Sequence, residues 1–319
     1  MSHDACPMLD RLIDRFLDHI QVLAWSPKTI VSYRTHLGVF CRYLASELSA
    51  TDIGAVTSET LLQYQTRLYE WTDAKGRGRS VATQAGRLSA LRSFFRFLVR
   101  TNVLQSDPSS TLVLPKRRHT LPRSILTKRE VKRLLAAPDP TIPLGLRDRA
   151  ILEVLYSTGV RNAELRSLKF YDLDFHRGIA RINQGKNGMD RVVPLGRAAS
   201  IWVRQYLELA RPRLRGSAHP ETLGKETVFI SRTGRPLDGQ GVIYALRKYG
   251  RQARIRKKIT PHTLRHTCAT HMLAGRADLR HIQAMLGHRS IASTQIYTQV
   301  EITDLKAVHR RCHPRGGRP

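Results

Sequence analysis

The C-terminal third of the chain gathers residues that can bind anions, ligate metals or act as nucleophiles. Two stretches carry them, TPHTLRHTCATHMLAG and, shortly afterwards, LGHRSIASTQIY. Imidazole pairs can ligate zinc, arginines can clamp phosphate oxygens, and a tyrosine hydroxyl among cations can become a nucleophile. The candidates are His262, Arg265, His266, His271, His281, His288 and Tyr297.

Zinc is the weaker of these alternatives. His262 and His266 are four residues apart, as in a helical metal pair. However, no glutamate separates them, no carboxylate follows closely, and Arg265 would repel a cation. We therefore interpret His266 and His271 as structural histidines, and we predict no metal.

An anion site fits the arginines better. His262 and Arg265 are three residues apart and share one face of a predicted helix that begins after Thr260. Arg161, in TGVRNAEL, lies at the predicted start of another helix, where free N–H groups favour phosphate. Two arginines from separate helices can hold the oxygens of one phosphate. Glu164 either orients Arg161 or is a surface charge.

Lys186 and Tyr297 each have a functional and a plain interpretation. Lys186 is an exposed turn lysine or a mobile general acid at the rim of a hairpin. Tyr297 is a packed aromatic or, because neighbouring cations lower a phenol's usual pKa of about 10, a nucleophile. Gly287 permits a turn that places His288 next to the same pocket.

The elements that must position these residues form two domains. Residues 1–105 show helical periodicity only, with Ser26 and Ser80 as helix caps. Residues 106–124 are proline-rich and basic, and we predict a linker there. Residues 125–312 form the second domain, mostly helical with a small antiparallel sheet around Asn187-Gly188, and residues 313–319 a disordered tail. The stretch VFISRTGRPL can add a strand.

Composition points to a polyanionic partner. The chain has 319 residues and a net charge of +29, and nearly all of the surplus lies beyond the first third. Counterion release from nucleic acid is the commonest use of such a surplus. The acidic start, the four scattered cysteines and the lack of a long apolar run predict a cytoplasmic protein without a membrane anchor. Candidate DNA contacts are Arg87, Arg92, Arg96, Lys116, Arg117 and Arg118.

Taken together, these motifs resemble the tyrosine recombinases of the phage integrase class, and most closely their Xer-like subgroup. The resemblance rests on STGVRNAEL, GKNGMDRVVPLG, PHTLRHTCATHML, LGHRSIASTQIYTQV and the ending HRRCHPR. It also covers the entry helix SPKTIVSYRTHLGVFCRYL, which is similar to the SAM-like core-binding domain of that class. The resemblance implies a two-domain, C-shaped DNA clamp.

The resemblance also implies a role for each candidate. Tyr297 would attack the scissile phosphodiester and form a 3′-phosphotyrosine link, while Arg161 and Arg265 stabilise the phosphoryl oxygens. Lys186 would protonate the departing 5′-oxygen, His262 would assist proton transfer, and His288 would donate to the phosphate. Neither ATP, metal nor another cofactor is implied. Met189-Asp190 departs from the family pattern, in which a second basic residue often follows the hairpin glycine.

The implied partner is double-stranded DNA with paired, inverted-repeat-like recombination sites. A homotetramer, or a heterotetramer with a paralogue, would form when each protomer passes its C-terminal helix to a neighbour. Val300, Leu305, Ala307 and Val308 offer an apolar strip for this, although the helix could instead pack on its own domain. The expected location is the cytoplasm, associated with the bacterial nucleoid, and the role stays open between resolving chromosome dimers and moving a plasmid, transposon or phage. The alternatives are a type IB topoisomerase-like enzyme and a non-catalytic DNA-binding protein.

Overall fold

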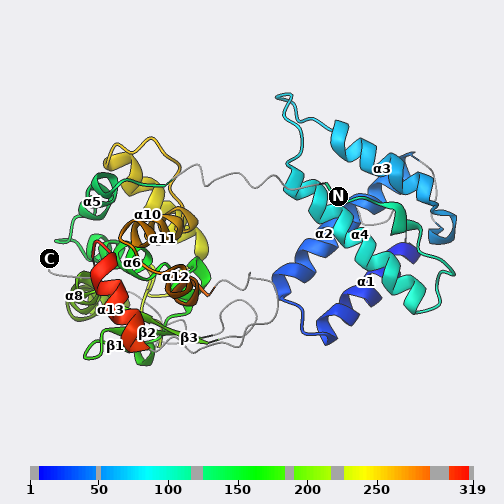
Figure 1. Ribbon diagram of the computed structural model, residues 1–319. Helices are drawn as coiled ribbons and strands as arrows, with labels where there is room; N and C mark the ends of the chain where they lie inside the picture. Colours follow the sequence, from blue (N-terminus) through cyan, green and yellow to red (C-terminus); the bar gives the residue numbers. More distant parts are fainter. Residues whose placement is uncertain are drawn as a thin grey trace. The chain divides into compact units, whose positions relative to one another are not determined.

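A computed structural model describes residues 7–47, 52–115, 125–183, 190–216, 226–287 and 302–315. Its described part is mostly helical with one three-stranded antiparallel sheet, which confirms the predicted fold class. The chain divides into two compact units, Met1–Thr120 and Leu121–Pro319. Both units are drawn in Figure 1. No described helix is long and apolar enough to cross a bilayer.

The first unit is a bundle of helices around an aromatic core. Phe16, Phe40, Phe94 and Phe95 are all fully buried and lie edge-on or tilted to one another. The predicted caps are present, because the Ser26 hydroxyl accepts the Thr29 N–H and the Ser80 side chain accepts that of Thr83. The helices are α1 Pro7–Val22, α2 Pro27–Glu47, α3 Ser58–Glu70 and α4 Val81–Arg100.

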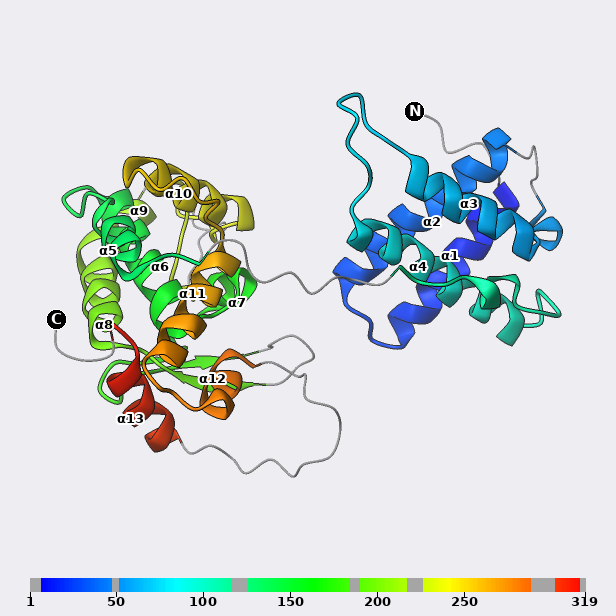
Figure 2. The same ribbon diagram turned by 45° about the horizontal axis from the view of Figure 1, so that its top comes forward.

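The connection from α3 to α4 projects from the bundle as a short hairpin, visible in cyan in Figure 1 and, turned, in Figure 2. Thr72 and Gly78 form an isolated antiparallel bridge at its base. At its tip the Asp73 carboxylate accepts the N–H groups of Lys75 and Arg77 and pairs with the Arg77 guanidinium. Hydrogen bonds and an ion pair within the hairpin therefore stabilise its conformation.

The first residues of the predicted linker pack on this bundle. A 3₁₀ turn, Pro108–Thr111, contacts α3 and α4, and Leu112 is buried with the bundle's core. The basic cluster of that linker, including Lys116, Arg117 and Arg118, lies outside the described residues.

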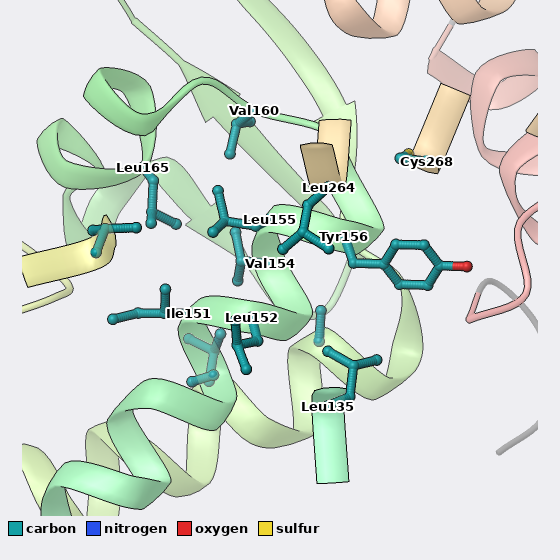
Figure 3. Packing of buried hydrophobic residues seen from close by; sticks show 14 of the residues in the cluster. Leu135, Ile151, Leu152, Val154, Leu155, Tyr156, Val160, Leu165, Leu264 and Cys268 are labelled. Atoms are coloured by element: carbon teal, nitrogen blue, oxygen red, sulfur yellow. The ribbon is translucent and has the colours of Figure 1, made fainter. Parts of the chain in front are cut away.

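The second unit surrounds one long buried helix, α6 (Pro143–Thr158). Thirteen of its residues are buried, and it ends at Gly159 in a left-handed turn. Figure 3 shows its apolar side chains with Leu135, Leu165 and Leu264 from neighbouring helices. The other helices are α5 Lys128–Ala136, α7 Asn162–Ser167, α8 Arg197–Gln205, α9 Arg211–Arg215, α10 Gly239–Gln252, α11 Pro261–Ala274, α12 Leu279–Leu286 and α13 Ile302–Cys312.

The sheet has the order β1-β2-β3 and is antiparallel throughout. Its strands are β1 Leu173–Asp174, β2 Ile179–Ile182 and β3 Arg191–Pro194, and Ile182 is opposite Arg191 at the end nearest the predicted Asn187-Gly188 turn. That turn lies outside the described residues. The stretch VFISRTGRPL, in which we expected a strand, forms only isolated bridges, such as Ile230 with Pro236.

The C-terminal helix packs on its own unit. α13 contacts β3, α11 and α12, with Val308 against the core and His309 and Cys312 buried. Ala307, expected in an apolar docking strip, is exposed in the single chain. Val300 and the side chain of Leu305 lie outside the described part of the chain.

Residues 313–315, the first part of the expected disordered tail, pack on α6, whereas residues 316–319 lie outside the described residues. The His313 side chain is buried and bonds to the Tyr156 carbonyl, with Nε2 and O 2.9 Å apart. The Arg315 guanidinium bonds to the Glu153 carboxylate, with Nε and Oε2 3.0 Å apart. In addition, the His309 Nε2 lies 2.7 Å from the Ser157 carbonyl oxygen. Three side chains, of His309, His313 and Arg315, therefore hold residues 309–315 on α6.

Candidate functional site

Arg161 lies where the sequence predicts it, at the entrance to a helix. It adopts an extended conformation directly before α7, two residues after the left-handed Gly159. Its backbone N–H donates to Glu164 Oε2 over 2.8 Å, and its Nη1 donates to Glu164 Oε1 over 2.7 Å. Glu164 therefore orients this arginine, which is the first of the two interpretations left open by the sequence.

Arg265 comes from α11, whose predicted start is present. Thr260 caps the helix and Pro261 occupies its first turn. The helix buries Leu264, Cys268 and Met272 as one seam, as their spacing predicts. Arg265 itself is only 4% exposed, and its Nη1 donates to the Gly159 carbonyl over 2.7 Å.

The end of α12 holds three arginines on three consecutive carbonyls. The Met285 carbonyl accepts Arg191 Nε over 2.9 Å, the Leu286 carbonyl accepts Arg265 Nη2, and the Gly287 carbonyl accepts Arg161 Nη2 over 3.1 Å. The last carbonyls of a helix have no partner within it and carry the negative end of its dipole. This end therefore fixes cationic groups from α7, α11 and β3 in one place.

Gly287 makes this arrangement possible. It ends α12 with a φ of +64°, a left-handed conformation that costs other residues about 1 kcal/mol. A Cβ here would also lie 3.3 Å from the Arg191 side chain. The sequence predicts only that Gly287 permits a turn. The structure shows that this glycine of the LGH motif also caps α12.

Glu164 and the arginines form an ionised network. Burial opposes ionisation of Glu164, but hydrogen bonds and charge from Arg191 and Arg161 outweigh it and lower its pKa to about 2. Burial lowers the pKa of Arg265 to about 10, and the charge of Arg161 acts in the same direction. Arg161 and Arg191 bond to the Glu164 carboxylate, and Arg265 is held nearby on backbone carbonyls. Three cations therefore meet one anion, and the cluster keeps an excess of positive charge that is suited to an anion.

The histidines separate into two groups. His262, one helical turn before Arg265, and His266 are both exposed. His271 is buried and its Nδ1 lies 2.8 Å from the Tyr156 hydroxyl, which fits the structural role predicted for it. Within the described ranges, no three side chains of His, Cys, Asp or Glu converge as a metal site would need.

Three of the six predicted catalytic residues cannot be placed. Lys186, His288 and Tyr297 lie outside the described residues. The structure brings together Arg161, Arg265 and the supporting Glu164, while their placement relative to those three stays a prediction.

Arg191 is a member of this network that sequence reasoning missed. It is the first residue of β3, and its Nη1 and Nη2 each bond to one Glu164 oxygen, over 3.0 and 2.8 Å. The available signal was its place in DRVVPLG, immediately after the hairpin of Lys186. A charged residue opening an otherwise apolar strand indicates a specific partner.

The candidate DNA contacts on α4 do not share one face. Arg92 and Arg96 are four residues apart and lie on the same side of the helix, with Arg96 exposed. Arg87 lies elsewhere on the helix and is half-buried.

Comparisons with known proteins agree with this architecture. Residues 124–303 match the phage integrase family, and residues 13–102 match the phage integrase N-terminal SAM-like domain. The chain is 38% identical over 307 residues to tyrosine recombinase XerC 2 of Ralstonia nicotianae, covering 96% of this chain and 86% of that protein. It is 37% identical to tyrosine recombinase XerD of Listeria innocua, covering 96% and 100%.

A solved structure shares the fold. The lambda integrase (75–356) dimer bound to a COC′ core site aligns with a TM-score of 0.66 and 19% identity, covering 91% of this chain and 99% of that one. The chain belongs to the phage integrase family. It is a tyrosine recombinase, an enzyme class that breaks and rejoins DNA in site-specific recombination, as the sequence motifs predicted.

Proposed function

We propose that this enzyme recombines DNA through a covalent 3′-phosphotyrosine intermediate centred on the cluster of Arg161, Arg265 and Glu164. The observation that supports it most directly is the anchoring of Arg161 and Arg265 on the adjacent carbonyls of Gly287 and Leu286. Two guanidinium groups held in this way need no reorganisation when charge develops on a phosphoryl group. The same glycine immediately precedes His288 in the chain.

The proposed step balances without a redox or nucleotide partner. The Tyr297 hydroxyl passes its proton to water, its oxygen forms a bond to phosphorus, and the bond from phosphorus to the 5′-oxygen breaks. Lys186 supplies a proton to that leaving oxygen, His262 assists proton transfer, and His288 donates to a phosphoryl oxygen. Arg161 and Arg265 stabilise the other oxygens. The new phosphotyrosine link retains the energy for rejoining.

Assembly on paired sites is part of the proposal. A lambda integrase tetramer bound to a Holliday junction shares this fold, with a TM-score of 0.66. We propose a homotetramer, or a heterotetramer with a paralogue, on inverted-repeat-like sites in cytoplasmic DNA, of chromosomal or mobile-element origin. α13 packs on its own unit in the single chain, and exchange between protomers would place the same buried face in a neighbour's groove.

The test is trapping of the covalent intermediate. Nicked suicide duplexes tiled from DNA flanking the gene are incubated with the enzyme in EDTA, beside Tyr297→Phe. We expect an adduct that survives a denaturing gel for the wild type only. Adduct formation by both proteins would overturn Tyr297 as nucleophile. DNA binding by both proteins without any adduct would favour the non-catalytic DNA-binding protein. Relaxation of supercoiled plasmid without strand exchange would favour the topoisomerase-like enzyme.

A further inference from the structure

Arg79, at the end of the α3–α4 hairpin, is held in place from two sides. Its guanidinium lies over the ring of Trp71, 3.7 Å from the centroid, at the other end of the hairpin. Its carbonyl accepts the Gln84 side chain over 3.1 Å, which ties the hairpin to the first turns of α4. The arginine is thus oriented before any ligand arrives.

Arg87 faces the same region. It lies three residues after Gln84 on α4 and so shares that side of the helix. Its Nε and Nη1 are buried without a hydrogen-bond partner among the described residues, and so is the Nε of Arg79. Arg87 also interacts with the Tyr64 hydroxyl, and the Nδ1 of His36 beside it is buried without a partner among the described residues.

Neither arginine forms an ion pair within the described part of the chain. In the same hairpin, Arg77 behaves differently, because its guanidinium lies 2.7 Å from the Asp73 carboxylate. Burial lowers the pKa of Arg79, and the charge of Arg87 lowers it further, so the two cations are close enough to repel.

Such a pair is costly unless an anion lies between its members. A buried donor without an acceptor costs about 1–3 kcal/mol, and more when it is charged. A phosphodiester relieves both the repulsion and the unmet donors, because its two non-bridging oxygens can each accept from a different guanidinium group. A carboxylate also has two oxygens, but their lone pairs lie in one plane, which suits donors from two directions less well.

We propose that Arg79 and Arg87 together bind a single phosphodiester group of duplex DNA, with Trp71 holding Arg79 in position. This rests on the proposed function, since duplex DNA is taken as the partner of the first unit. The contact is independent of base sequence, because it reads only the backbone. Trp71 and Arg79 are therefore binding residues outside the catalytic cluster.

The test measures how affinity for a duplex of arbitrary sequence changes with salt, using the full chain. Each phosphate contact contributes about 0.9 to the slope of log affinity against log salt concentration. We expect the double variant Arg79→Gln/Arg87→Gln to lose about one unit of slope. Arg77→Gln removes one charge from the same hairpin, and that charge is already paired with Asp73, so it should leave the slope almost unchanged.

Two results would overturn the shared contact. A loss of about two units in the double variant would mean two separate phosphates. A slope equal to that of Arg77→Gln would mean no contact at all. Thermal melting of each variant shows whether the fold is kept, and Trp71→Leu gives an independent check, since it should weaken duplex binding without removing charge.

The source of the phosphate is tested by NMR on the Trp71 indole N–H. We expect duplex DNA to shift this signal at far lower concentration than inorganic phosphate does. Equal responses would reassign the pair as a site for a free anion. The adduct assay keeps the two proposals apart. A wild-type adduct with unchanged slopes rejects only the arginine pair, and slope changes without any adduct reject only the chemistry.

Discussion

Arg191 bonds to both carboxylate oxygens of Glu164, with Nη1–Oε1 and Nη2–Oε2 distances of 3.0 and 2.8 Å. Arg161 donates to the same carboxylate from the other side, over 2.7 Å. Glu164 is therefore a shared anchor between the sheet and the entrance of α7. Because Arg161 is a proposed phosphate ligand, the position of one catalytic group depends on a strand residue 30 positions away.

Replacing Glu164 by Gln should slow cleavage much more than it weakens DNA binding. The amide cannot accept from three donor groups, so Arg161 and Arg191 lose their fixed geometry while their charges remain. We expect the single-turnover rate of adduct formation to fall at least about tenfold, equivalent to about 1.4 kcal/mol. Glu226→Gln is the matched control, since Glu226 pairs with Lys169 and is 64% exposed. Equal loss in both variants would contradict the anchoring role.

The same carboxylate should make stability depend on acid. Its pKa is about 2 when folded, against an ordinary 4.5, so the folded state binds this proton less readily than the unfolded one. The contribution, of order 3 kcal/mol, is complete above pH about 4.5 and is lost as the pH falls toward 2. The stability difference between wild type and Glu164→Gln, measured by urea unfolding, should therefore shrink across that window. A stability difference between the two proteins that does not change with pH would contradict the lowered pKa of Glu164.

Gly287→Ala should impair cleavage beyond its effect on folding. The added Cβ strains a left-handed residue and meets the Arg191 side chain, which displaces the carbonyls that hold Arg161 and Arg265. Gly178→Ala is the control, because its φ is +62° and its Cβ would meet only ordinary contact at 3.5 Å. We expect both variants to lose similar thermal stability. Only Gly287→Ala should also form the adduct more slowly. Equal rates would show that the carbonyls do not position the arginines.

Mild acid should loosen the C-terminal segment. Burial lowers the pKa of both His309 and His313, whose rings stack 4.7 Å apart, and each charge would also repel the other. The unfolded state therefore takes up protons near pH 6.5 while the folded state does not. Stability should fall as the pH drops below about 6.5, by up to about 1.4 kcal/mol per pH unit for each histidine.

Hydrogen exchange of residues 302–315 at pH 7.5 and 5.5 checks this directly. His313→Gln, which keeps a donor to the Tyr156 carbonyl but cannot titrate, should reduce the pH dependence. Unchanged protection in the wild type between the two pH values would contradict the prediction.

Gly275→Ala should undock α13 from its own unit. A Cβ at this position would lie 2.5 Å from the Cys312 carbonyl oxygen and 2.9 Å from its Cα, so backbone must move. Limited proteolysis should then cut the C-terminal segment faster, while the rest of the unit stays folded. Gly216→Ala, whose Cβ would meet nothing nearer than 3.8 Å, is the control and should digest like the wild type.

Local patterns in the sequence were sufficient for the helices and their ends. Ser26, Ser80 and Thr260 cap helices as predicted, because a hydroxyl that accepts a first-turn N–H needs only neighbouring residues. The helix partners Arg161 and Glu164 were likewise visible as a short-range pair. Family motifs supplied the enzyme class, since their residue types and order are specific.

The tertiary structure alone decided which distant groups meet. Arg191 with Met285, Arg265 with Gly159 and His309 with Ser157 join positions 94, 106 and 152 residues apart, through carbonyls that every residue carries. A backbone carbonyl leaves no trace in residue type, so no pattern predicts which one accepts a given arginine. The same holds for Arg79 and Arg87. Only the packing around them reveals that these arginines have buried donors without a partner among the described residues.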